Sequence, residues 1–143
     1  MSTAPESFPA AMPLLSTVDI SVRWRDLDAL NHVNNSTYLT YLEEARVQWL
    51  QRAPGRWGSE HAVPVMVASE LNYRLPIEWP GQVRVELYRA RLGNSSMTIA
   101  HRIVDASDNS KLYCDGHVVM VWMDPATGKS VPLPQAVREI TPG

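Results

Sequence analysis

Hydrophobic and polar residues alternate strictly along residues 16–25, which predicts a half-buried β-strand. Successive side chains of a strand point to opposite sides, so the apolar positions are expected to line the core. Those positions are Val18, Ile20, Val22 and Trp24.

A different pattern begins at Asn35, where apolar and aromatic residues extend over about four helical turns. They surround much of the helix circumference, which predicts one long helix that is buried on several sides. Asn34 or Asn35 is suited to cap its start, and Pro54-Gly55 is suited to end it. The apolar set is Tyr38, Leu39, Tyr41, Leu42, Ala45, Val47, Trp49 and Leu50.

Four more strand-like runs follow the helix, separated by residues that favour turns. Such short gaps favour antiparallel hairpins, because a parallel crossover needs about a dozen or more residues. We expect a terminal helical turn at residues 135–140. The four runs are residues 63–74, 82–92, 96–105 and 111–123.

The order of these elements predicts an α+β fold with one layer wrapped around another. A single, mostly apolar helix must be covered, and the sheet is the only element large enough to cover it. We therefore expect a curved, five-stranded antiparallel sheet around one long central helix. The outer strands of such a sheet lack partners, which favours pairing with a second copy of the chain.

Composition places this fold in one domain of residues 14–143, preceded by a disordered lead-in of residues 1–13 that holds three prolines and no basic residue. A net charge of −2 gives no basic surplus for nucleic acid or for a membrane surface. No apolar run approaches the roughly 18 residues of a membrane span. A single cysteine, Cys114, excludes an internal disulfide, so we expect a soluble cytoplasmic protein.

Polar residues gather between the first strand and the helix, where packing gives no reason for them. Residues 25–35 hold the carboxylates Asp26 and Asp28, followed by His32, Asn34 and Asn35. The free N–H groups and the dipole of a helix N-terminus can hold a developing oxyanion. A carboxylate beside them could attack a carbonyl or activate a water. If the strand reaches both acids, they share a face, and their repulsion raises one pKa.

Each of these residues also has a simpler interpretation. Either acid could cap a turn, the asparagines could act only as helix caps, and His32 could be an ordinary loop residue. An Asp-x-Asp pair after a strand also opens haloacid-dehalogenase-type phosphatases, but their later lysine and acidic motifs are not recognisable here. An EF-hand calcium loop fails because Leu30 and Thr37 occupy ligand positions. A metal site at the acids and His32 lacks a second ligand cluster.

The remaining candidates favour structural roles. We expect His101 to be a hydrogen-bonded sheet residue, and Cys114 a small core residue. Asp115 and His117 alternate onto one face of the last long strand and are expected to form a pair. His61 lies in a loop and carries no signal.

Together these motifs resemble those of hotdog-fold acyl-CoA thioesterases, closest to the 4-hydroxybenzoyl-CoA thioesterase type and its YbgC-like bacterial relatives. The resemblance spans about residues 16 to 135 and is specific for the family rather than for a substrate. It rests on Asp-x-Asp at residues 26–28, His-Val-Asn-Asn at 32–35, Tyr-Leu-x-Tyr-x-Glu-x-Ala-Arg at 38–46, Tyr-Arg at 73–74, Arg-Leu-Gly-x-Ser-Ser at 91–96 and Val-Trp-Met-Asp at 121–124.

The resemblance implies that Asp28 carries the chemistry, either as a nucleophile or as a general base for water. It also implies that a backbone N–H at or near Asn35 holds the thioester oxygen. Asp26 and His32 take supporting positions. Glu43 belongs to the helix signature. It is expected to fix the polar segment of residues 25–35, the polar corner, through hydrogen bonds, or to serve as a reserve acid.

The family binds coenzyme A across a dimer interface, so the resemblance implies an acyl-CoA substrate and a homodimer or tetramer. Coenzyme A belongs to the substrate, and neither a cofactor nor a metal is implied. The family's basic cluster before its serine is absent here, and Arg89 and Arg91 could substitute for it. The expected substrate contacts are Asn34, Tyr38, Arg89, Arg91, Ser95 and Ser96. The alternative is a non-catalytic hotdog module that binds an acyl-thioester or a partner protein.

Overall fold

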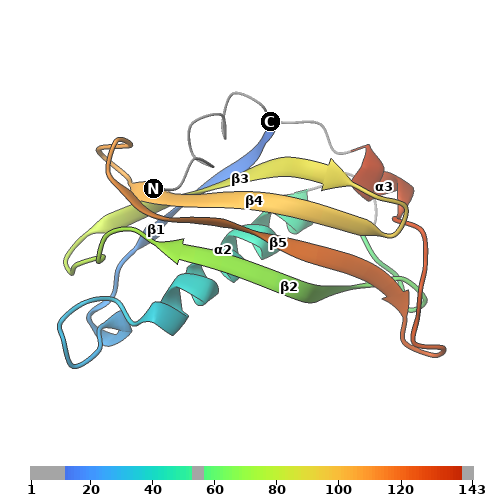
Figure 1. Cartoon of the computed structure of the whole chain (residues 1–143), viewed down its shortest axis with the longest axis horizontal. Coiled ribbons are helices and arrows are strands. Elements are labelled where there is room, and N and C mark those ends of the chain that lie inside the picture. Colours follow the sequence, from blue (N-terminus) through green and yellow to red (C-terminus); the bar gives the residue numbers. More distant parts are fainter. Residues whose placement is uncertain (1–11, 53–56, 140–143) are drawn as a thin grey trace.

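A computed structural model describes residues 12–52 and 57–139, and in it one antiparallel sheet curves around one long helix (Figure 1). The strand order is β1-β3-β4-β5-β2, and the short β6 pairs with β5. The predicted α+β hotdog arrangement is confirmed. The elements are β1 (Leu14–Ser21), η1 (Trp24–Asp26), α2 (Asn35–Arg52), β2 (Val63–Tyr73), β3 (Gln82–Leu92), β4 (Ser96–Asp105), β5 (Leu112–Asp124), β6 (Lys129–Ser130) and α3 (Gln135–Arg138).

The sequence predicts the bounds of β3 and β4 correctly, and those of β2 and β5 to within one residue. It does not predict the two-residue β6. The terminal turn begins at Gln135 as expected, but residue 140, the Pro54-Gly55 stop and most of the lead-in lie outside the described residues.

The prediction for β1 is wrong at its C-terminal end. The strand stops at Ser21, and Trp24 is 70% exposed rather than turned inward. The reason is local, since the Arg23 N–H donates to the Asp26 side chain and the chain turns into the short 3-10 helix η1. Alternation of residue types therefore continues for a few positions beyond the strand itself.

Helix α2 buries one broad side against the sheet and leaves a stripe open. Leu42 and Ala45 are fully buried, and they pack in one core cluster with Leu87, Ile99 and Trp122 of the sheet. Burying a leucine or isoleucine side chain of this kind stabilises the fold by roughly 1.5–3 kcal/mol. Leu39 and Val47, eight positions apart on the same helix face, stay exposed. No helix in the described part of the chain has the length and apolar character that a membrane crossing requires.

Two predictions about residues in the sheet are wrong. Asp115 pairs with Arg74, at 3.0 Å, and accepts a hydrogen bond from Asn72, rather than pairing with His117. His101 is fully buried, and neither ring nitrogen makes a hydrogen bond of standard geometry with the described residues, although the Glu70 backbone interacts with the ring. Burial, followed by the positive charge of Arg46 and by His117, lowers the pKa of His101 to about 3. The imidazole is therefore neutral in the folded protein.

Stability is expected to fall as the pH drops below the pKa of free histidine. The unfolded chain binds a proton near pH 6.5 and the folded chain does not. The contribution is complete above about pH 6.5, and it is lost at about 1.4 kcal/mol per pH unit below it. Urea denaturation between about pH 7 and pH 5 measures this slope, in a window where carboxylates with ordinary or lowered pKa values contribute little.

His101→Leu should flatten this dependence. Ile99→Val changes another fully buried side chain of the sheet but removes no titratable group, and it should keep the wild-type slope. An unchanged slope in His101→Leu would contradict the assignment.

Candidate active site

The polar corner lies at one end of the molecule, in the loop between η1 and α2 (Figure 1). Leu27 and Val33 form an isolated antiparallel bridge, which closes the loop at its base. Inside it, the Asp28 N–H donates to the His32 carbonyl at 2.9 Å, and the Asn31 N–H donates to the Asp28 carbonyl at 3.1 Å. Asn31 has a φ of 61°, a left-handed conformation that asparagine tolerates well. The loop is therefore a defined turn.

Asp28 is held by this turn and remains partly exposed. One carboxylate oxygen, Oδ1, accepts the Leu30 N–H at 2.9 Å. The other has no hydrogen-bond or ion-pair partner among residues 12–52 and 57–139. A carboxylate oxygen that is both positioned and free is suited to attack a carbonyl or to take a proton from water.

The asparagines form the start of α2. Asn34 is the cap, because its Oδ1 accepts the Ser36 N–H at 2.8 Å, so the prediction of an asparagine cap is confirmed. Asn35 is the first helical residue, and no group in the described ranges accepts a hydrogen bond from its N–H. Tyr73 donates to the Asn35 carbonyl at 3.1 Å, and its ring packs edge-on against Tyr38. The corner thus offers a free backbone donor beside two aromatic rings.

Asp26 differs from Asp28 in almost every respect. It is buried, and its carboxylate accepts hydrogen bonds from Tyr41 Oη at 2.7 Å, Arg23 N–H at 2.9 Å and Arg23 Nη2 at 3.1 Å. Burial raises the pKa of Asp26, but the hydrogen bonds from Tyr41 and Arg23 outweigh it and hold the pKa below its ordinary value. The predicted repulsion between the two acids does not govern Asp26, because the chain leaves the strand conformation before reaching it.

His32 and Glu43 are less involved than the sequence suggests. His32 contributes its carbonyl to the turn, while its ring lies 4.0 Å from Glu78 and is partly exposed. Glu43 is exposed on α2 and makes no hydrogen bond with the described residues, so the expected bonds to the corner are absent. Tyr41 makes that connection instead. The sequence indicates it only through the Tyr-x-x-Tyr spacing, which places Tyr38 and Tyr41 on one helix face.

The other expected substrate contacts lie at the opposite end of the molecule. Arg89 and Arg91 are near the end of β3, and Ser95 and Ser96 follow at the turn into β4, far from the loop that carries Asp28 (Figure 1). At this turn Arg138 donates to the carbonyls of Gly93 and Asn94. Within one chain these residues cannot surround a thioester held at the corner.

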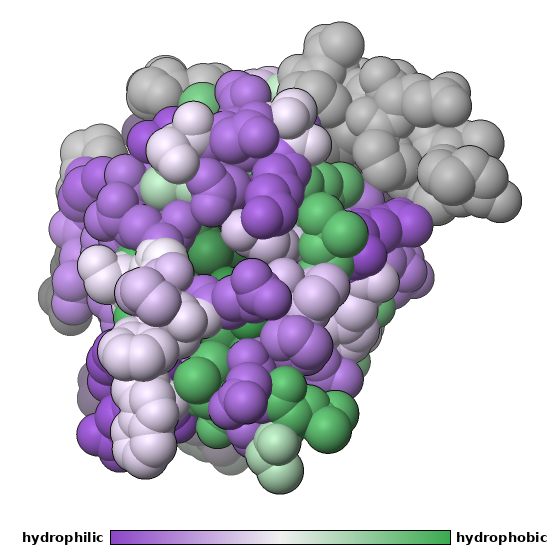
Figure 2. All heavy atoms as spheres, turned by 90° about the vertical axis from the view of Figure 1, so that its left-hand side faces the viewer, coloured by the Kyte–Doolittle hydropathy of each residue, from purple (hydrophilic) through white to green (hydrophobic). Residues whose placement is uncertain are grey.

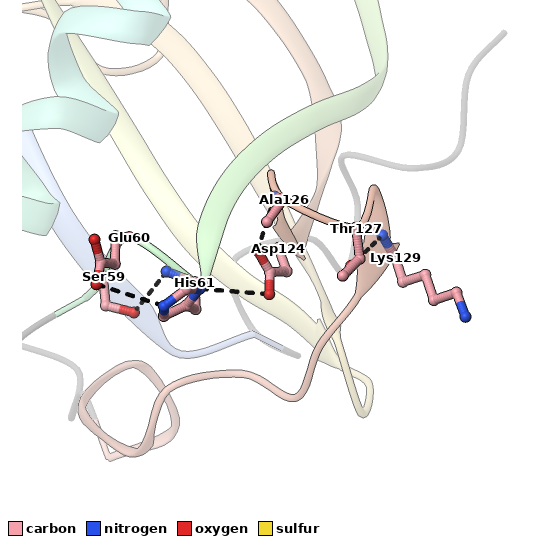
Figure 3. A network of polar contacts seen from close by, with 7 residues as sticks. All are labelled: Ser59, Glu60, His61, Asp124, Ala126, Thr127 and Lys129. Atoms are coloured by element: carbon pink, nitrogen blue, oxygen red, sulfur yellow. Dashed lines mark hydrogen bonds and ion pairs between the residues drawn. The ribbon is translucent and has the colours of Figure 1, made fainter.

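A second polar network closes the loop before β2 (Figure 3). His61 lies 3.5 Å from Asp124 at the end of β5 and 3.4 Å from Glu60, and its backbone N–H donates to Ser59 Oγ. Asp124 also accepts the Ala126 N–H. These contacts join two loops at the end of the sheet remote from Asp28, which indicates a structural clasp.

The surface at the corner is hollowed and partly apolar. A depression of about 430 Å³ borders the turn, and its lining residues are Trp24, Leu27, Asn31, Glu78 and Trp79. Figure 2 faces this end and shows hydrophobic residues gathered between hydrophilic ones. Leu30, at the tip of the turn, is 76% exposed. An acyl compound approaching Asp28 would meet both apolar and polar groups here.

Comparison with known proteins gives consistent results. The family model of the thioesterase-like superfamily matches residues 22–140. The long-chain acyl-CoA thioesterase FadM of Escherichia coli (strain K12) is 29% identical over 122 residues, which cover 84% of this chain and 92% of FadM.

Two solved structures share the fold. The PA2801 protein of Pseudomonas aeruginosa is 41% identical with a TM-score of 0.82, over 87% of this chain and 96% of that one. A thioesterase from Thermus thermophilus, in complex with coenzyme A and Zn, is 36% identical with a TM-score of 0.74, over 90% and 97% of the two chains.

Proposed function

Because the chain belongs to the thioesterase-like superfamily, we propose that it hydrolyses an acyl-CoA thioester to a free carboxylic acid and coenzyme A. It is a thioester hydrolase, as its relatives' names indicate. The observation that carries the proposal is that one short segment, from the loop to the first residue of α2, holds both the free Asp28 oxygen and the unpartnered Asn35 N–H. Asp28 supplies the attack, and the helix N-terminus receives the negative charge that develops on the carbonyl oxygen.

Two routes use the same groups. In the first, Asp28 takes a proton from water as the water oxygen attacks the thioester carbon; the carbon–sulfur bond then breaks, and the thiolate leaves and is protonated. In the second, the Asp28 carboxylate attacks directly, expelling the thiolate and forming a mixed anhydride that water cleaves. Asn35 N–H holds the oxyanion in both routes. Asp26 and His32 act through the loop rather than on the substrate.

The proposal is tested by measuring free thiol released from a panel of acyl-CoAs of increasing chain length, with a carrier-protein thioester beside them. An enzyme releases thiol catalytically from at least one member, and the ranking of rates identifies the acyl group. Binding of an acyl-CoA without any thiol release would instead identify a non-catalytic module.

The proposed reaction needs only the acyl-CoA substrate and water, because coenzyme A is the leaving group. Within the part of the chain that the structure describes, no group of three or more His, Cys, Asp or Glu side chains is arranged to hold a metal ion. We therefore propose that turnover is unchanged by a chelator. Loss of thiol release on chelation, with recovery on adding Zn²⁺, would contradict this.

We further propose that the working unit is a homodimer joined along β2, with a dimer of such dimers as the larger alternative. Residues 65–70 of β2 are exposed on both faces of the strand, and in the described ranges β2 pairs only with β5. Its free edge can therefore pair with another strand. Leu39 and Val47 add exposed apolar surface on α2. A second copy would also bring its own β3–β4 turn to a site that one chain leaves incomplete.

A further inference from the structure

One buried hydrogen bond ties the second turn of α2 back to the segment that precedes the helix. Tyr41 Oη donates to Asp26 Oδ2 at 2.7 Å, and both residues are buried. We propose that Tyr41 is a positioning residue: through Asp26 it holds the Asn35 N–H in place relative to Asp28. The inference rests on the proposed function, because Asp28 and Asn35 N–H are its two working groups.

Asp26 accepts hydrogen bonds from three parts of the chain: the segment after β1, the start of α2 and its second turn. Its side chain accepts hydrogen bonds from Tyr41 on the helix and from Arg23 after β1. Its backbone carbonyl accepts the N–H of Asn34, the helix cap, at 2.9 Å. Since Asn34 immediately precedes Asn35, a shift of Asp26 displaces the cap and the free N–H together.

The loop that carries Asp28 is also held in place by its connection to Asp26. Leu27, directly after Asp26, bridges to Val33, directly before Asn34. Asp28 follows Leu27 and is fixed to the turn by its N–H and its Oδ1. The positions of both the Asp28 carboxylate and the Asn35 N–H therefore depend on Asp26. Catalysis is sensitive to such placement, because a misplacement of about 1 Å can lower the rate by about 100-fold.

The donor and the acceptor keep their roles at working pH. Burial, followed by the hydrogen bond to Asp26, raises the pKa of Tyr41 well above its ordinary value, so the hydroxyl stays protonated. The hydrogen bonds that Asp26 receives keep it ionised despite its burial. A hydrogen bond to an ionised acceptor is stronger than a neutral one. The ring of Tyr41 packs in the core cluster, so its hydroxyl is the part that performs the positioning.

The test compares Tyr41→Phe with Tyr113→Phe. Tyr113 is also buried and donates to a carboxylate, that of Asp105 at 3.1 Å, but its hydroxyl makes no hydrogen bond with Asp26, Asp28, Asn34 or Asn35. Both substitutions remove one hydroxyl and should lower the Tm by a few degrees. Tyr41→Phe should also lower kcat at least 10-fold with KM changed less than about 2-fold, since positioning acts on the transition state. Tyr113→Phe should leave kcat unchanged.

A double variant and a second readout make the test independent of folding and of activity. Asp26→Asn should lower kcat similarly, and Tyr41→Phe/Asp26→Asn should lose no more than the larger single loss, because both act through one hydrogen bond. Hydrogen exchange at the Asn34 amide should speed up about 10-fold in Tyr41→Phe and not in Tyr113→Phe. Equal kcat values in the two tyrosine variants would overturn positioning in catalysis. Unchanged Asn34 exchange would overturn the structural link even if the protein released no thiol.

Discussion

Replacing Asp28 with asparagine is expected to lower kcat by about 100-fold to 10,000-fold, the range for removing a positioned acid–base or nucleophilic group. The amide that replaces the carboxylate can neither take a proton from water nor form an anhydride. It keeps an oxygen at Oδ1, which can still accept the Leu30 N–H, so the turn should survive. KM should change little, because the substrate contacts remain. Steady-state thiol release and thermal melting measure both effects.

A matched control for this substitution is Asp108→Asn. Asp108 lies in another exposed turn, and its Oδ1 likewise accepts the N–H two residues later, that of Ser110, at 3.1 Å. The Asp108→Asn variant should therefore keep the wild-type kcat and Tm. Near-wild-type turnover in Asp28→Asn would contradict the proposed role of Asp28 as nucleophile or general base. With wild-type enzyme, single turnovers in heavy-oxygen water label Asp28 only if it is the nucleophile.

The parts of the fold that the sequence predicts are those fixed by local patterns. The bounds of β3 and β4 are predictable because their alternation is bounded by turn residues such as Gly93. The end of β1 is not, because alternation continues through Trp24 while a hydrogen bond between Arg23 and Asp26 bends the chain. Residue types alone do not reveal that competition between a strand and a local turn.

The candidate site divides in the same way. Asp28, Asn34 and Asn35 lie within a few positions of one another, so a contiguous motif and the helix start suffice to bring them together. The contact between Tyr41 and Asp26 spans 15 positions and depends on the angle at which α2 leaves the loop. Burial without a hydrogen bond of standard geometry, as at His101, depends on the packing of several strands and is equally hidden from the sequence.

The distance between the corner and the β3–β4 turn has a further consequence. The resemblance implies that Arg91 and Ser95 contact the same substrate as Asp28, yet in a single chain the β3–β4 turn lies at the end of the molecule opposite the loop that carries Asp28 (Figure 1). If those residues contact the same substrate molecule as Asp28, they must come from another chain. In the proposed dimer that chain pairs along the open edge of β2, so a variant that loses the dimer is expected to lose catalytic activity as well.

Replacing Val67 with lysine is therefore expected to convert the protein to monomers. Val67 lies at the bulge in β2, between residues that pair regularly with β5, and it is 59% exposed in the single chain. In a paired edge it would be covered, and an unpaired lysine buried there costs about 3 kcal/mol or more. Because both copies carry the lysine, the cost is about 6 kcal/mol per dimer, which corresponds to roughly 10,000-fold weaker dimerisation. Sedimentation over a concentration series measures the change.

Thr17→Lys places the same charge on the other edge strand, at an exposed position of β1. It should leave the dimer mass measured by sedimentation unchanged. Val67→Lys should also lose thiol release in proportion to its monomer fraction, and regain it at high protein concentration, because the second chain completes the site. A monomeric Val67→Lys with full activity would show that one chain suffices. A dimer lost in Thr17→Lys instead would move the interface to β1.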